Sequence, residues 1–220
     1  MIDWKSIDTV LLDMDGTLLD LEFDNFFWNQ HLPKVYAETH KLSEADAQLQ
    51  MNTKFNIGRG TLNWYCLDHW SQQFQLDIPS LKREQSHRVA LRPLTVEFLQ
   101  QLKKSPVNVV MVTNAHPETL AIKMEKIDIT MWFDRIVVSH DLNAAKEEQE
   151  FWHKLQQLNP FDPARTLLID DTEAVLDSAK RYGIAHLITL LQPDSQQPNR
   201  LKTTYPAIHH FDEIMHGETP

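Results

Sequence analysis

Residues 10–20 read VLLDMDGTLLD, a short apolar run that ends at two aspartates one residue apart. A buried strand that ends in carboxylates indicates a site, because an ionised carboxylate away from water is costly unless a partner or a metal compensates it. On a continuing strand Asp13 and Asp15 would lie on the same side, and Gly16 would break the strand and re-aim the second carboxylate. Taken alone, the motif also fits an Asp-Gly turn that merely ends a strand.

Alternating apolar and helical segments predict an α/β fold. Buried parallel strands are expected at five short apolar runs: Val10–Asp13, Val107–Thr113, Arg135–Ser139, Thr166–Asp170 and His186–Leu191. Helical stretches lie between the last four: Pro117–Lys126, Lys146–Leu158 and Thr172–Tyr182. This order predicts a Rossmann-like, doubly wound parallel sheet with right-handed crossovers.

Polar residues close three of the predicted strands. Asp13, Thr113 and Asp170 each stand at a strand's carboxyl end, where open α/β sheets bind ligands. Lys146 follows the third strand at the same edge. We therefore expect these residues to converge on one site.

The connection between the first two strands is much longer than a crossover requires. Residues 21–91 read as helix, which predicts a helical insert, and residues 1–20 and 92–220 then form the α/β core. Arg92-Pro93 marks the return to the core before a helix at Leu94–Lys103. The polar, Pro-broken tail after Pro193 is expected to be a loosely packed closing segment.

Composition limits the class of protein. The chain has 220 residues, 42% of them hydrophobic and 24% charged, which is ordinary for a globular protein. A single cysteine, Cys66, excludes an internal disulfide, and no spacing among the eleven histidines is typical of a zinc site. The absence of a signal peptide or membrane-length apolar run predicts a cytoplasmic location. A formal net charge of −10 argues against nucleic-acid and anionic-membrane partners.

The stretch Asp13–Asp20 resembles the first motif of the haloacid dehalogenase superfamily, most of whose members are phosphatases. That family has a Ser or Thr at the end of a second strand, a lone Lys after a third and an acidic pair after a fourth. Here Thr113, Lys146 and Asp170-Asp171 follow in that order. Further segments are similar to bacterial nucleotidases that act on purine 5′-monophosphates (GMP/IMP): Leu11–Asp20, Leu62–Asp68, Thr113–Pro117 and Ile169–Asp171.

The resemblance implies a Mg²⁺-dependent phosphomonoesterase that forms an aspartyl-phosphate. Asp13 would be the nucleophile, and Asp15 the general acid and then base. Because both reactants are anionic, a metal and a lysine must cancel charge, which assigns Lys146 to catalysis and to phosphate binding. Thr113 and Asn114 would complete the phosphate site at a helix start.

The metal ligands implied are Asp13, the backbone carbonyl of Asp15, and the acidic pair. Asp171 is the better candidate for direct ligation, and Asp170 would be a second ligand or would orient Lys146. If Asn143 caps the following helix, Lys146 falls in its first turn, where the helix field disfavours a cation and a functional reason is needed.

In the family the position of the insert carries a cap that closes over the site and selects the substrate. Some cap residues could contact a nucleotide, although core packing or solvation is the commoner explanation for each: Phe26, Trp28, Lys54, Arg59, Asn63 and Trp64. The alternatives to a nucleotidase are a sugar-phosphate phosphatase or phosphomutase and a non-catalytic binding protein. A monomer or small homo-oligomer with a small phosphorylated substrate is expected.

Overall fold

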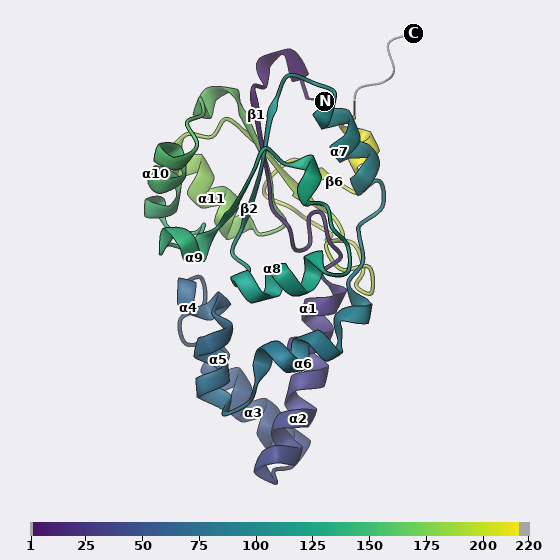
Figure 1. Ribbon diagram of the computed structural model, residues 1–220, viewed down its shortest axis with the longest axis vertical. Coiled ribbons are helices and arrows are strands. Elements are labelled where there is room, and N and C mark those ends of the chain that lie inside the picture. The colour runs from purple at the N-terminus through teal and green to yellow at the C-terminus, as the bar shows by residue number, and fades with distance from the viewer. Residues whose placement is uncertain (1, 216–220) are drawn as a thin grey trace.

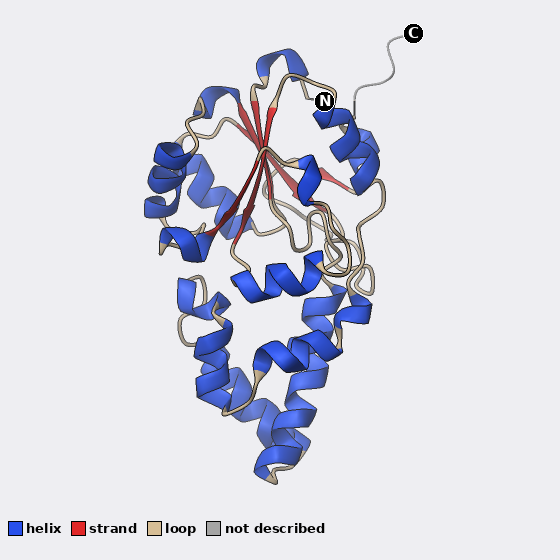
Figure 2. Ribbon diagram, viewed as in Figure 1, coloured by secondary structure: helices blue, strands red, loops and turns tan. Residues whose placement is uncertain are grey.

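A six-stranded parallel sheet forms the centre of the protein, whose residues 2–215 we describe from a computed structural model. The strand order is β3-β2-β1-β4-β5-β6. The strands are β1 (Thr9–Leu12), β2 (Asn108–Thr113), β3 (Arg135–Val138), β4 (Thr166–Ile169), β5 (His186–Leu190) and β6 (Ala207–Ile208). The sheet with helices on both faces confirms the predicted doubly wound α/β fold (Figure 2).

Helices cover both faces of the sheet. Since successive side chains of each strand point to opposite faces, both sets of side chains are buried. Val10 and Leu12 pack in one cluster with α7 (Thr95–Lys103) and α8 (Pro117–Met124). Leu11 packs in the other with α10 (Gln149–Leu158) and α11 (Glu173–Tyr182), which lie together on the other side of the sheet (Figure 1). Continuous apolar strands are therefore required, as the sequence predicts.

Residues 21–91, which we call the helical unit, extend from one end of the sheet (Figure 1). Its α-helices are α1 (Glu22–Phe26), α2 (Leu32–His40), α3 (Glu44–Phe55), α4 (Leu62–Tyr65), α5 (Leu67–Phe74) and α6 (Ile78–Glu84). They pack around a core of their own that includes Phe27, Trp70 and Phe74. Within residues 2–215, no helix is both long and apolar enough to cross a bilayer. The division into two domains stays a prediction.

The two connections to the helical unit run side by side. The Asp20 N–H donates to Ala90 O (2.9 Å), and the Arg92 N–H donates to Leu18 O (2.9 Å). The Thr95 hydroxyl donates to the same Leu18 carbonyl at 3.0 Å. The chain thus leaves and re-enters the core through one paired segment next to the end of β1.

The helix predicted at residues 146–158 begins later than expected. Asn143 does not cap it but ends α9 (Ser139–Leu142) in the left-handed conformation with φ 49°, which asparagine tolerates. Lys146 therefore lies in a turn between two helices, and its assignment to a first helical turn is wrong. The Glu148 carboxylate holds this turn by accepting from the Ala145 N–H at 3.0 Å.

The segment after Pro193 is exposed at residues 195–199 but packs against the core at residues 205–214, contrary to the loose packing that the sequence predicts. It contributes β6 to the sheet and buries Tyr205, Phe211 and Ile214. The Phe211 ring stacks on Phe98 of α7, with centroids 4.5 Å apart. The apolar residues of this segment are too widely spaced among prolines to show a periodic pattern, so only their distant partners explain their burial.

Replacing Phe211 with alanine tests this packing. We expect F211A to lower the free energy of unfolding by about 3–5 kcal/mol, because it removes a buried ring from a close-packed core. Urea denaturation measures the change. Leu201, which is fully exposed, supplies the control, since L201A should change stability by less than about 0.5 kcal/mol. Equal stability of the two variants would contradict a packed C-terminal segment.

Candidate active site

The four sequence motifs meet at the carboxyl edge of the sheet. Asp13, Thr113 and Asp170 directly follow or end β1, β2 and β4, which are neighbours in the sheet. The Lys146 ammonium donates to Asp13 Oδ1 (2.6 Å), Asp170 Oδ2 (2.7 Å) and Val112 O (3.2 Å). Burial opposes the charge on Lys146, but the two carboxylates outweigh it and raise its pKa. Lys146 is therefore a permanent cation between two acids.

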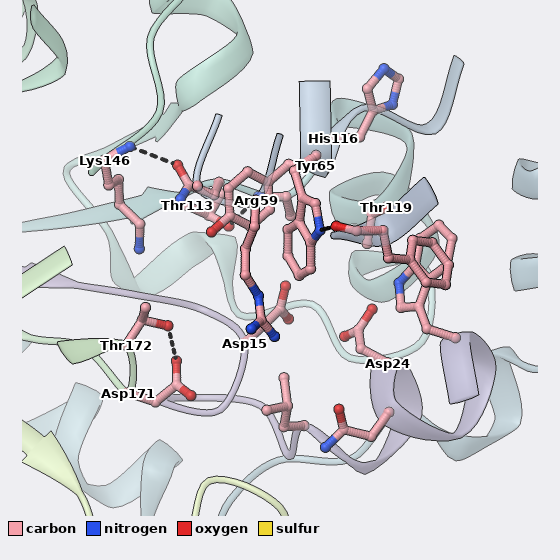
Figure 3. A pocket seen from close by; sticks show the side chains of 18 of the residues that line it. Asp15, Asp24, Arg59, Tyr65, Thr113, His116, Thr119, Lys146, Asp171 and Thr172 are labelled. Atoms are coloured by element: carbon pink, nitrogen blue, oxygen red, sulfur yellow. Dashed lines mark hydrogen bonds between the residues drawn. The ribbon is translucent and has the colours of Figure 1, made fainter. Parts of the chain in front are cut away.

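The two acids of the 170–171 pair have different environments. Asp170 has both oxygens engaged, one by Lys146 and the other by the Thr172 N–H at 2.9 Å. Asp171 accepts from the Thr172 hydroxyl at 3.1 Å, as Figure 3 shows, and lies 3.5 Å from Arg200. Burial and the negative charges of Asp13 and Asp170 raise the pKa of Asp171 to about 8. The ion pair with Arg200 lowers this pKa but does not offset burial and the two neighbouring carboxylates.

The carboxylate cluster fits a hard divalent cation. Carboxylate oxygens of Asp13, Asp170 and Asp171 lie within 4.8 Å of one another, and all three side chains are buried. Gly16, with φ +80°, brings the loop so close that an added Cβ would lie 2.8 Å from Asp171 Cγ. Mg²⁺ prefers such oxygen donors, and its charge would relieve the repulsion that raises the Asp171 pKa.

Asp15 belongs to a second chain of buried charges that joins the sheet to the helical unit. The Lys123 ammonium, on α8, donates to Asp15 and to Asp24 Oδ2 of α1 (2.5 Å). The Lys82 ammonium, on α6, donates to the other oxygen of Asp24 at 2.6 Å. Burial raises the pKa of Asp15 to about 6 although Lys123 opposes the shift. Burial also opposes ionisation of Asp24, but its two lysines hold its pKa well below the usual value.

Sequence reasoning missed Lys123, Asp24 and Lys82. Each stands in a helical segment where a charged residue ordinarily points to solvent, and their partners lie far away in the sequence. Apolar neighbours flank Lys123 and precede Asp24, but Arg83 and Glu84 follow Lys82, so no local pattern marks all three.

The predicted phosphate residues hold one another in place. Asn114 Oδ1 accepts from the Lys146 backbone N–H (2.9 Å), and its amide donates to Glu147 Oε2 (2.9 Å). Thr113 Oγ1 accepts from the Ala115 N–H at 3.0 Å, next to the start of α8. From the helical unit the Tyr65 hydroxyl donates to Glu147 Oε1 at 2.5 Å. Tyr65 and Glu147, which were not predicted, thus link the helical unit to the phosphate residues.

A cavity of about 1010 Å³ lies between the sheet edge and the helical unit. Asp13, Asp15, Asp171, Thr113 and Lys146 line its floor, and aromatic and polar side chains of the helical unit line the opposite side (Figure 3). Of the candidate cap residues, those that line it are Trp28, Arg59 and Trp64. Within residues 2–215, Phe26, Lys54 and Asn63 are not part of its lining.

Comparisons with known proteins agree with this geometry. The family model for haloacid dehalogenase-like hydrolases matches residues 7–183. The GMP/IMP nucleotidase YrfG of Escherichia coli (strain K12) is 38% identical over 97% of this chain and 96% of its own.

Solved structures share the fold at lower identity. A HAD phosphatase from Thermococcus onnurineus aligns with a TM-score of 0.76 and 20% identity, covering 94% of this chain and 96% of that one. The putative HAD-hydrolase YfnB of Bacillus subtilis, bound to magnesium, aligns with a TM-score of 0.67 and 18% identity over 94% of this chain and 96% of its own.

Substitution of the buried Lys123 and Lys82 tests the energetic role of the ion pairs that join Asp15 to Asp24. We expect K123M to lower the free energy of unfolding by about 3–5 kcal/mol, because it leaves Asp15 unpaired and takes one of two cations from Asp24. K82M should cost less, since Asp24 keeps Lys123. Urea denaturation measures both, with K126M at an exposed position of the same segment as control. If K123M and K126M were equally stable, the buried ion pairs of Asp15, Lys123, Asp24 and Lys82 would not contribute to stability.

Proposed function

Because the chain belongs to the haloacid dehalogenase-like hydrolases, we propose that it is a Mg²⁺-dependent phosphomonoesterase acting on purine nucleoside 5′-monophosphates. The observation that carries the proposal is the Lys146 ammonium between Asp13 and Asp170, at the floor of a cavity that also contains Asp15 and Asp171. The E. coli relative, named as a GMP/IMP nucleotidase, supports the substrate class.

In the proposed reaction a carboxylate oxygen of Asp13 attacks phosphorus, and the bond from phosphorus to the ester oxygen breaks. Asp15 protonates the departing alkoxide and then takes a proton from the water that hydrolyses the aspartyl-phosphate. Attack of one anion on another is opposed by repulsion, which the Lys146 charge lowers. Burial raises the pKa of Asp15 to about 6, so that it can both hold and release a proton near neutral pH.

The Mg²⁺ ion would be held by Asp13, Asp171 and the backbone carbonyl of Asp15. When bound, it supplies positive charge to the phosphoryl oxygens and to the buried carboxylates. We assign Asp170 to orienting Lys146 rather than to direct ligation, because both of its oxygens already accept hydrogen bonds.

Thr113, Asn114 and Lys146 would bind the phosphoryl group. The Thr113 hydroxyl, next to the start of α8, would donate to a phosphoryl oxygen without a glycine-rich loop. Because Asn114 also bonds the Lys146 backbone, phosphate binding and lysine placement would depend on one side chain.

We propose that the helical unit is a cap that closes over the bound nucleotide. The cavity between the helical unit and the sheet is large enough for a nucleoside monophosphate, and its aromatic wall offers a surface for the base. The cytoplasmic location and the monomeric or small homo-oligomeric state stay predictions.

Phosphate release from a panel of phosphorylated metabolites tests the proposed activity. With Mg²⁺ we expect release from GMP and IMP to exceed that from sugar phosphates, and EDTA to abolish it. Preference for sugar phosphates would favour the sugar-phosphate phosphatase instead.

Replacing Asp13 with asparagine tests the proposed nucleophile. D13N should lower kcat by at least about 10³-fold while circular dichroism stays unchanged, because the amide keeps the shape of the nucleophile but cannot attack. Full activity of D13N would remove Asp13 from its role.

Replacing Arg59 with alanine tests whether the helical unit recognises the substrate. It is exposed and extends into the cavity, where Figure 3 shows its guanidinium among the site residues. We expect R59A to raise KM for GMP by about 10–100-fold with little change in kcat, because a charge-assisted contact to substrate is lost. K54A serves as control, since the Lys54 ammonium donates to Gln73 O and lies outside the cavity lining. Equal KM values for the two variants would contradict a binding role for Arg59.

A further inference from the structure

Three side chains of types that can ligate a metal lie together where the helical unit touches the core, and one of them, His116, also lines the cavity of the carboxylate site. Cys66 lies between α4 and α5, His116 precedes α8, and His140 is part of α9. A possible ligand atom of each lies within 4.8 Å of those of the other two. In Figure 3 the His116 ring points away from Asp15 and Asp171, so it is directed out of the carboxylate site.

The imidazole ring of His140 has no hydrogen-bond partner among the described residues. Both of its ring nitrogens are shielded from solvent. A buried polar atom without a partner is costly and calls for a ligand. An unprotonated imidazole nitrogen offers a lone pair to a metal ion.

The ring of His140 is held beside that of His116. Their centroids are 5.0 Å apart and the planes are nearly perpendicular, at 82°. His116 Nδ1 accepts from the Glu118 N–H at 3.3 Å, and Nε2 lies 3.8 Å from the Asp68 carboxylate, so a metal bound to Nε2 would replace that contact. The site therefore has three donors and an acidic neighbour.

The donor atoms favour Zn²⁺ over Mg²⁺. Thiolate and imidazole ligands suit zinc, whereas Mg²⁺ requires oxygen. In a tetrahedral zinc site the ligand atoms are about 3.4–3.6 Å apart, as follows from Zn–S and Zn–N bond lengths. Side-chain rotations that draw the three ligand atoms closer by roughly 1 Å would meet that spacing.

We propose that Cys66, His116 and His140 form a Zn²⁺ site that ties the helical unit to the core. Cys66 belongs to the helical unit and both histidines belong to the core, so one ion would bridge the two. Binding would release the thiol proton and form one Zn–S and two Zn–N bonds, with water in the fourth position. The neighbouring Tyr65 already bonds Glu147 across the same interface, which keeps Cys66 close to the histidines.

Cobalt(II) is a direct probe of this site, because only a thiolate ligand gives a sulfur-to-cobalt charge-transfer band in the near ultraviolet. Metal-free protein is titrated with Co²⁺ while excess Mg²⁺ occupies the carboxylate site. We expect one equivalent of Co²⁺ to develop this band together with the intense visible bands of tetrahedral cobalt, and Zn²⁺ to abolish both.

C66S and H140Q test the proposed ligands, and neither Cys66 nor His140 lines the cavity of the carboxylate site. C66S should lose the charge-transfer band entirely. H140Q should weaken Co²⁺ binding by at least about tenfold, since loss of an outer-shell partner alone costs that much. A wild-type protein without the band, or C66S and wild type with the same spectrum, would overturn the site. These readouts need no enzymatic activity, so they stand apart from the proposed phosphatase function.

The proposed Zn²⁺ site would also affect GMP hydrolysis, an expectation that rests on the proposed function. If the helical unit must open to admit nucleotide, Zn²⁺ at this bridge should inhibit GMP hydrolysis in the presence of saturating Mg²⁺. C66S, with unchanged activity in Mg²⁺ alone, should require at least about tenfold more Zn²⁺ for the same inhibition. Equal sensitivity of C66S and wild type would mean that zinc acts only at the carboxylates, and it would overturn the locking role.

Discussion

One buried cation holds the site together. The Lys146 ammonium lies between Asp13 and Asp170 with almost no access to water, and the three groups come from three separate segments. Without the lysine, two carboxylates would share a space from which solvent is excluded, and at least one would take up a proton. The arrangement is possible because β1 lies between β2 and β4, so that the ends of all three strands converge.

The second chain of charges, which we call the Asp15–Lys82 chain, connects that edge to the helical unit. Asp15 belongs to the core, Lys123 to α8, and Asp24 and Lys82 to the helical unit. The Lys82 ammonium also lies 5.0 Å from the ring centroids of Phe23 and Phe27, which lessens the cost of burying it. Because each buried charge has an opposite partner, the position of the helical unit and the environment of Asp15 depend on each other.

The two candidate metal sites differ in the hardness of their donors. The sheet edge presents carboxylates, which suit a hard divalent ion, and the interface beside α8 presents sulfur and nitrogen, which suit a softer one. α8 connects them, since it directly follows His116 and carries Lys123 towards Asp15. A constraint on the interface would therefore act close to the residues proposed for catalysis.

The sequence by itself determined the sheet and the residues at its edge. Runs of apolar residues that stop at Asp13, Thr113 and Asp170 mark strands by a local pattern, and the parallel topology then requires those residues to meet. Lys146 was also predicted, although the local structure around it was not, because Asn143 ends one helix instead of starting the next.

Only the tertiary structure decided which other side chains join the site. Lys123, Asp24 and Tyr65 carry no local pattern that separates them from solvated or core residues, since their partners lie far away along the chain. The same holds for Cys66 and the two histidines, and for the packed segment around Phe211. The physical reason is that a strand or helix is set by neighbours in sequence, whereas the pairing of a buried charge or a metal ligand is set by neighbours in space.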